Sequence, residues 1–346
     1  MSARRRSPIR RPFWTRPAPL RAEDALPLVL AAGAADAAPP EARLRRGRAA
    51  WPLALTPGEP LGPERAAWAG RLVEEAPPGL YDLEVRIGGR RYTERRAVAV
   101  LPERVAGLTL AHCSDLHVLK PTAEALEDRT GRILALIERL NALRPDVVVC
   151  TGDLIGRYDP AKRPLPAKTI RWQIRWVAEH LGEIEAPLYV TIGNHDVAFR
   201  GTRKAWYAAM GGAGGERPDD ASVDWGPYHL SLLDAFAYYD GRNVLRASAF
   251  TADQLAWLRA DMAATHPDAT RLLFAHYDYH RQLPGILPFL GLDGFFYGHS
   301  GPLYPEELER HAVWDGHLPA ALALRVVRVV GKAVEVRESV PWRALG

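Results

Sequence analysis

The sequence predicts a layered α/β domain preceded by a small domain built of β-strands. From about residue 106, short apolar runs alternate with amphipathic helical stretches, which is typical of α/β domains. Before residue 105 the chain is rich in Pro, Gly, Arg and Ala, and turn residues separate short alternating runs. A chain of 346 residues accommodates one large domain and a small one.

The N-terminal region divides into a basic start and a predicted β-domain. Residues 1–11 include five arginines, and we expect them to be a solvated, disordered segment. Residues 12–105 contain apolar or alternating runs at 26–30, 51–55, 80–87 and 92–101. Gly88-Gly89 separates the last two runs and predicts a hairpin turn. Short strands divided by turns indicate a β-sandwich-like accessory domain over residues 12–105.

Residues 106–346 form the predicted α/β domain. Strands are expected at 108–111, 146–150, 188–192, 228–233, 272–275 and 294–297, and a hairpin at 322–330 and 333–338. Helices are expected at 123–143 and 167–181, and a third opens at Thr251. Gln254 follows Thr251 by three residues, which is the signature of a capping box.

Composition limits the classes of function and location. Two cysteines, Cys113 and Cys150, do not make a disulfide framework; we expect buried thiols and leave a single disulfide open. No stretch is long and apolar enough to span a membrane, and no convincing signal peptide is present, which favours a cytoplasmic location and leaves an exported one open. The net charge of +4 predicts no stable nucleic-acid partner. Protein partners are not predicted.

Five short polar motifs each follow a predicted strand. They are Asp115-Leu116-His117, Gly152-Asp153, Gly193-Asn194-His195-Asp196, His276 and Gly298-His299. Polar sites in α/β sheets gather beyond the carboxyl ends of the strands, so these motifs are expected to converge. Carboxylate oxygen, amide oxygen and imidazole nitrogen are ligands for Mn, Fe, Zn and similar ions. Buried together without a cation, such groups are costly, so the ordered set predicts a metal site.

This ordered set resembles the calcineurin-like metallophosphoesterases, whose pattern runs D-x-H, GD, GNH-D/E, H and GH-x-H. The resemblance covers about residues 108–300. It implies a layered β-sandwich flanked by helices, the metallophosphoesterase fold. It also implies hydrolysis of a phosphate mono- or diester by metal-activated hydroxide.

The resemblance assigns expected roles to eight residues. Asp115 and His117 bind the first divalent metal ion, and Asp153 bridges both ions. The remaining ligands of the second ion are Asn194, His276 and His299. His195 lies beside the substrate phosphate as an acid or electrostatic stabiliser, and Asp196 orients it.

One position departs from the family pattern. The last motif reads Gly298-His299-Ser300-Gly301, so Gly301 replaces the final histidine, a ligand of the first metal. The first site is therefore expected to be weakened unless another side chain substitutes, for which the sequence offers Tyr304, Glu306, Glu307 and His311. Two alternatives stay open: a nuclease of the same superfamily, and a catalytically impaired scaffold or binding protein.

Overall fold

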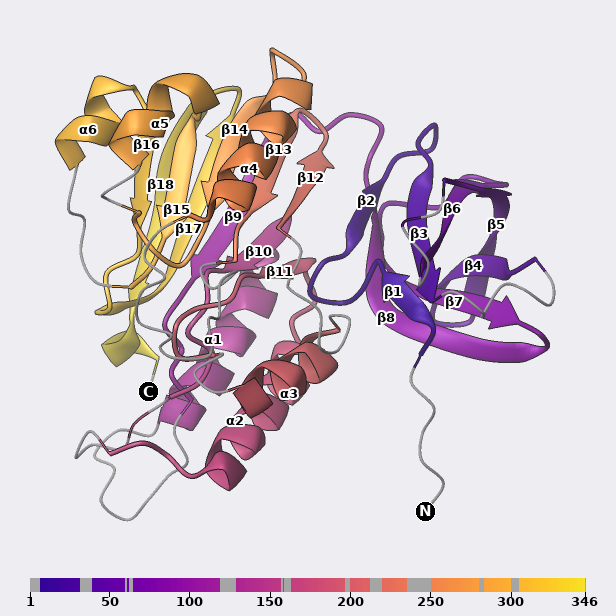
Figure 1. Ribbon diagram of the computed structural model, residues 1–346, viewed down its shortest axis with the longest axis horizontal. Helices are drawn as coiled ribbons and strands as arrows, with labels where there is room; N and C mark the ends of the chain where they lie inside the picture. Colours follow the sequence, from indigo (N-terminus) through magenta and orange to yellow (C-terminus); the bar gives the residue numbers. More distant parts are fainter. Residues whose placement is uncertain are drawn as a thin grey trace. The chain divides into compact units, whose positions relative to one another are not determined.

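The computed structural model describes residues 7–31, 39–59, 61, 65–118, 129–156, 158, 163–196, 200–211, 220–234, 250–279, 283–299 and 305–345. The chain divides into two compact units, residues 1–105 and 106–346. Figure 1 shows the strands and helices of both units.

The first unit is a single hydrogen-bonded sheet with the strand order β1-β3-β6-β5-β4-β7-β8-β2. Its strands are β1 (Ile9–Arg11), β2 (Ala18–Leu20), β3 (Leu26–Ala31), β4 (Glu41–Arg46), β5 (Ala49–Pro57), β6 (Arg65–Leu72), β7 (Gly79–Ile87) and β8 (Arg90–Val100). Neighbouring strands are antiparallel except for β2 and β8. The turn between β7 and β8 is the expected Gly88-Gly89, and both residues have positive φ angles.

Alternation along the strands separates an apolar face from a charged one. Leu44 and Leu83 are paired across β4 and β7 and are fully buried in the core of this unit. On the other face, Glu84 forms ion pairs with two arginines. Its Oε1 lies 2.5 Å from Arg43 Nη2, and its Oε2 lies 3.2 Å from Arg45 Nη1. Burial opposes ionisation of Glu84, but the hydrogen bonds from Arg45 and Arg43 hold its pKa below the usual range. This pairing allows a carboxylate to be buried on the sheet.

The start of the chain differs from the expectation. Residues 1–11 were expected to be disordered, yet Ile9–Arg11 forms β1 and pairs with β3. The physical reason is the side chain of Ile9, which is buried in the core of the first unit. Residues 1–6 lie outside the described part of the chain.

The second unit contains two five-stranded sheets and is a mixed α/β structure. One sheet has the order β11-β10-β9-β17-β18, with β9 at Leu108–Cys113, β10 at Val147–Cys150, β11 at Leu188–Val190, β17 at Leu322–Val330 and β18 at Ala333–Pro341. The other runs β12-β13-β14-β15-β16, with β12 at Ala221–Trp225, β13 at Tyr228–Leu232, β14 at Thr270–Phe274, β15 at Gly294–Tyr297 and β16 at Trp314–His317.

Helices lie on both sides of these sheets (Figure 1). One group contains α1 (Arg129–Leu143), α2 (Ala167–Leu181) and α3 (Arg200–Met210), and the other contains α4 (Ala252–Ala264), α5 (Leu283–Leu290) and α6 (Pro305–Arg310). A short 3₁₀ helix, η2, follows at Trp342–Ala344. None of the helices in the described part of the chain is long and apolar enough to cross a membrane.

Parallel pairing fixes where the polar loops lie. Strands β9, β10 and β11 run parallel to one another, and so do β13, β14, β15 and β16. The carboxyl ends of parallel strands share one edge of a sheet, so the loops that follow them emerge together.

Several expected elements have the expected ends. Helix α2 spans the expected residues 167–181 and β15 the expected 294–297. The capping box is present: Thr251 Oγ1 accepts from Gln254 N at 3.1 Å, and Gln254 Oε1 accepts from Thr251 N at 3.2 Å. Helix α1 begins at Arg129, and the expected residues 123–128 fall outside the described part. Strands β12 and β16 and helices α3, α5 and α6 were not expected.

The two cysteines are buried free thiols. Cys113 and Cys150 face each other in register at the ends of β9 and β10. Burial and their mutual contact raise the pKa of the Cys150 thiol well above its ordinary value, the contact with Cys113 being the larger cause. The Cys150 thiol therefore stays protonated and behaves as a small apolar group.

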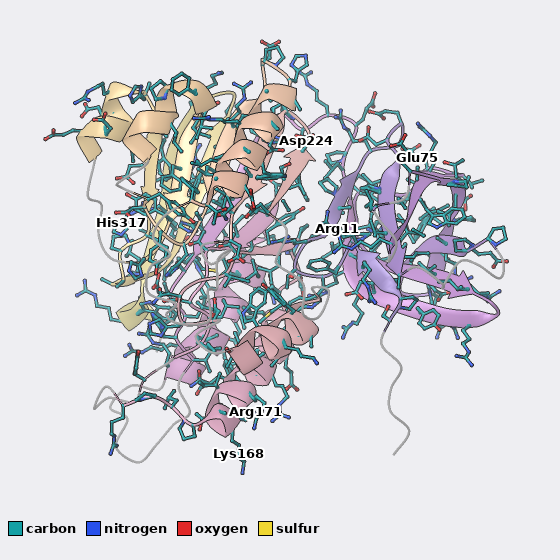
Figure 2. The ribbon with its side chains drawn as sticks, viewed as in Figure 1. Arg11, Glu75, Lys168, Arg171, Asp224 and His317 are labelled. Carbon is teal, nitrogen blue, oxygen red and sulfur yellow. The ribbon has the colours of Figure 1, made fainter. Side chains whose placement is uncertain are left out.

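An ion-paired histidine joins β13 to α4. His229 Nδ1 lies 2.7 Å from Asp224 Oδ1, and Nε2 lies 3.0 Å from Asp261 Oδ2. Two ring nitrogens facing two carboxylates require both nitrogens to be protonated, so the ring is an imidazolium. Burial opposes this charge, but the hydrogen bonds to Asp224 and Asp261 raise the pKa of His229 from 6.5 to about 9. Asp224, labelled in Figure 2, is exposed.

The raised pKa predicts alkaline destabilisation of this unit. Because the folded pKa of about 9 exceeds the ordinary 6.5, the stabilisation is complete below pH 6.5 and is lost as pH rises through 9. We expect His229→Gln to remove it, so that raising pH from 6 to 9.5 costs the native protein about 1 kcal/mol more than the variant, a value reduced by solvent screening of Asp224. Urea unfolding at both pH values measures this difference, and equal pH dependence in the two proteins would contradict it.

Candidate metal centre

The loops at the strand ends bring all eight sequence-predicted site residues into one region. Strands β9, β10 and β11 deliver Asp115, His117, Asp153, Asn194, His195 and Asp196 from one sheet. Strands β14 and β15 deliver His276 and His299 from the other. Direct contacts connect the two sets.

Asp153 lies at the centre of this cluster. Its side chain is fully buried, and its Oδ2 lies 3.4 Å from Nε2 of His276 and 3.8 Å from Nε2 of both His117 and His195. Two groups of potential ligand atoms, each within 4.8 Å of one another, share this carboxylate. One group is His117, Asp153 and His195, and the other is Asp153, His276 and His299. Asp153 is thus the residue that the two groups have in common.

Asp115 connects the loop after β9 to the loop after β15. Its Oδ2 accepts a hydrogen bond from Ser114 Oγ at 2.7 Å and another from the backbone N–H of His299 at 3.0 Å. Its Oδ1 lies 3.4 Å from Nε2 of His117. The carboxylate is thus fixed on one side and presents its other oxygen to the imidazole.

His276 is oriented by contacts at both ring nitrogens. Nδ1 lies 2.8 Å from the backbone oxygen of Thr151, which can only accept, so Nδ1 carries a proton. Nε2 lies 2.9 Å from Oδ1 of Asn194. A histidine that donates its Nδ1–H to a carbonyl directs Nε2 at the position where a metal ion binds.

Asp196 joins two metal-site loops through their backbones. Its carboxylate accepts from the N–H groups of Gly193, Asp153, Leu154 and Ile155 at distances of 2.8–3.3 Å. Its hydrogen bonds therefore act on the backbone beside His195 and Asp153. Burial and the charge of Asp153 raise the pKa of Asp196 to about 7.

His195 reaches the same centre from the loop after β11. Its backbone N–H donates to Asp153 Oδ1 at 2.7 Å, and its ring centroid lies 4.6 Å from that of His117. The ring of Tyr158 approaches it edge-on at 6.2 Å. His195 is partly exposed, whereas Asp153 beside it is buried. This exposure lets a group from solvent approach His195.

The backbone at the site is held in an uncommon conformation. Asp115, His117, Asp153 and His299 have φ angles of 55°, 46°, 52° and 60°. Side-chain-bearing residues rarely adopt this left-handed region, and each such residue costs on the order of 1 kcal/mol. Hydrogen bonds from the backbone N–H groups of Asp115, His117 and His299 hold three of these residues in place.

At Gly193 and Gly298, the absence of a side chain makes room for the carboxylates of Asp153 and Asp115. A Cβ at Gly193 would collide with the backbone nitrogen and Oδ1 of Asp153. At Gly298, a Cβ would collide with Ser114 Oγ and lie 2.5 Å from Asp115 Oδ2. Gly193 therefore allows two loops of one sheet to approach closely, and Gly298 does the same for loops from the two sheets.

Opposite charges balance within the cluster. Burial opposes ionisation of Asp153, but the charge of His276 lowers its pKa below the usual range. Burial likewise opposes the charge of His276, but Asp153 raises its pKa to about 9. For Asp115, burial is outweighed by the hydrogen bond to His117 and the charge of His276, so its pKa is also low. Ionised carboxylates among imidazole and amide donors make a ligand set that suits Mn, Fe or Zn.

The sequence offered four substitutes for the histidine that Gly301 replaces in the family pattern. Gly301 and Tyr304 fall outside the described residues. Glu307 pairs with Arg310 at 2.7 Å. Within the part of the chain that the structure describes, Glu306, Glu307 and His311 belong to neither group of potential ligand atoms.

Sequence reasoning missed two residues that fix the ligands. Ser114 and Thr151 hold Asp115 and His276, respectively. Ser114 directly precedes the first motif and Thr151 directly precedes the second, and this adjacency was the available signal. Thr151 acts through its backbone oxygen, so its residue type carried no information about that contact.

The fold and this cluster define a phosphoesterase. The sequence profile of the calcineurin-like phosphoesterases matches residues 108–302, and the chain belongs to this family. A cAMP/cGMP dual specificity phosphodiesterase of Mycobacterium tuberculosis is 30% identical over 182 residues, which are 51% of this chain and 51% of that protein. The chain thus matches about half the length of this curated relative.

Among solved structures, an amylomaltase from Corynebacterium glutamicum is 13% identical, with 43% of this chain and 22% of that chain covered. Its TM-score of 0.20 is too low to describe this fold.

The close approach at Gly298 predicts that Gly298→Ala disrupts the metal centre. The added methyl group would displace Ser114 or Asp115, and overpacking of this kind costs about 1–3 kcal/mol. We expect lower unfolding stability and a loss of bound manganese, measured by urea titration and elemental analysis. Gly285→Ala is the matched control, because no atom other than those of its chain neighbours and its own helix backbone lies within 4 Å of a Cβ placed there. Equal behaviour of the two variants would contradict the steric argument.

Proposed function

We propose that this protein hydrolyses a phosphate diester at a centre of two divalent metal ions. The observation that carries the proposal is the buried carboxylate of Asp153, which two groups of potential ligand atoms share. The printed name of the Mycobacterium tuberculosis relative, a phosphodiesterase, favours a diester over a monoester. The match covers half of each chain, so the cyclic nucleotides named for that relative are one substrate class to test first.

Asp115 and His117 would hold the first ion, and Asn194, His276 and His299 the second. Asp153 would contact both. The distances between these groups support this division, because Asp115 lies near His117 whereas Asn194 lies near His276. Mn, Fe and Zn all suit this mixture of oxygen and nitrogen donors. Gly301 removes one ligand from the first site, which makes its affinity the lower of the two.

When bound, two such ions polarise the phosphoryl oxygens and lower the pKa of a water held between them. His195 would then act from the exposed side of the cluster, where its ring stabilises charge on the phosphoryl group. In its protonated form it would donate its proton to the leaving oxygen. Asp196 would keep the backbone beside His195 and Asp153 in place through its N–H contacts.

Variants of Asp153 and His195 separate metal binding from turnover. We expect Asp153→Asn to lose both ions, because a neutral amide replaces the shared charge. His195→Ala should keep the ions and lose about 10²–10⁴-fold in kcat, the range for removal of a general acid. Elemental analysis and hydrolysis of bis(p-nitrophenyl) phosphate with Mn²⁺ measure the two effects. His266→Ala is the control, because His266 is exposed in the turn after α4.

Parallel assays with p-nitrophenyl phosphate decide the ester class. Faster turnover of the bis-ester supports the proposal, and faster turnover of the monoester would replace it with a phosphatase. A metal-loaded protein that hydrolyses neither ester would support the scaffold alternative. Retention of both ions by Asp153→Asn would show that this carboxylate does not bridge them.

A further inference from the structure

The exposed face of α2 carries two adjacent columns of side chains. Lys168, Arg171 and Arg175 recur at intervals of three and four residues, so they lie along one side of the helix. Trp172 and Trp176 form the second column. All three cations are exposed, and the tryptophans are half-buried. Figure 2 shows Lys168 and Arg171 extending from the ribbon at the start of α2.

The cationic column forms no ion pair with the carboxylates of the described residues. Among the described residues, no carboxylate pairs with Lys168, Arg171 or Arg175, although other exposed arginines of this unit, such as Arg310, do form ion pairs. The next position on this side of the helix, one turn beyond Arg175, is the acidic residue Glu179. In sequence, residues 157–175 contain six lysines and arginines and one acidic residue. This face therefore attracts anions locally, although the net charge of the chain is only +4.

The aromatic column presents a row of rings. The centroids of Trp172 and Trp176 lie 6.3 Å apart with an angle of 34° between the planes. The ring of Trp176 lies 4.3 Å from that of His180. Tryptophan rings at a surface, side by side with arginines, offer stacking positions for bases next to contacts for phosphates.

The start of α2 is connected to the candidate metal centre. Tyr158, whose ring lies 6.2 Å from that of His195, forms a β-bridge with Pro164. Helix α2 begins at Ala167, three residues after Pro164. A strand bound along α2 would therefore lead toward the region that the phosphodiester hydrolysis above would use.

We propose that the face of α2 formed by Lys168, Arg171, Trp172, Arg175 and Trp176 binds single-stranded nucleic acid. A membrane surface is the less suitable partner. Among the described residues, none of the exposed large apolar side chains lies on α2, whereas a helix that inserts into lipid exposes an apolar face. Overall charge predicted no stable nucleic-acid partner. The arrangement on α2 argues against that expectation, because local charge spacing, and not net charge, sets the contacts with phosphates.

Fluorescence anisotropy with a labelled 12-nucleotide oligothymidine tests this surface. The metal is removed with EDTA, so binding is measured apart from hydrolysis, and failure of either proposal leaves the other testable. We expect Arg171→Glu with Arg175→Glu to weaken binding at least tenfold. The plot of log K against log salt has a negative slope, and its magnitude should decrease by about 1.4. The reason is that two phosphate contacts are lost and each contributes about 0.7 in a single strand. The matched control is Arg259→Glu with Arg343→Glu, two exposed arginines elsewhere in the same unit.

A second variant tests the aromatic column. Trp172→Leu keeps an apolar side chain but removes the ring, so we expect a loss of about fivefold or more in affinity with an unchanged circular dichroism spectrum. Three results would overturn the proposal: no binding of the oligonucleotide, equal weakening by the two arginine pairs, or binding of phosphatidylglycerol vesicles in place of the oligonucleotide.

Discussion

The buried carboxylate of Asp153 is the constraint on which the second unit depends. A charge in a dry interior is costly unless charged and hydrogen-bonding partners surround it. Here those partners come from loops that are far apart in sequence, because Asp153 meets His117, His195 and His276. The two sheets must therefore hold their strand ends at fixed positions. Local strain at four site residues and the close approach of Gly193 and Gly298 follow from the same requirement.

Much of this arrangement could be predicted from the residues. Helix α2 and the capping box at Thr251 depend on local patterns, and these lie where the pattern placed them. The convergence of the candidate site residues was predictable because each motif follows the end of a buried strand and the motif order is that of a known family. The N-terminal strand β1 was missed because its arginines dominate the composition, while the burial of Ile9 depends on a distant strand.

Contacts between distant loops could not be predicted. The carboxylate of Asp196 accepts from four backbone N–H groups, and a backbone group carries no residue signature. The column of Lys168, Arg171 and Arg175 on α2, in contrast, could have been found from the sequence, because the helix was expected at 167–181 and helical periodicity places these residues along one side.

Strand β9, which delivers Asp115, is paired on one side with β10 and on the other with β17. The first partner follows within about 40 residues, but the second lies more than 200 residues downstream. During synthesis, β9 therefore keeps one open edge until Leu322–Val330 has emerged, and an unpaired edge of buried, apolar residues is prone to associate with other chains. A nascent chain interrupted before that strand would be an aggregation hazard even though every ligand of the candidate centre had already been made.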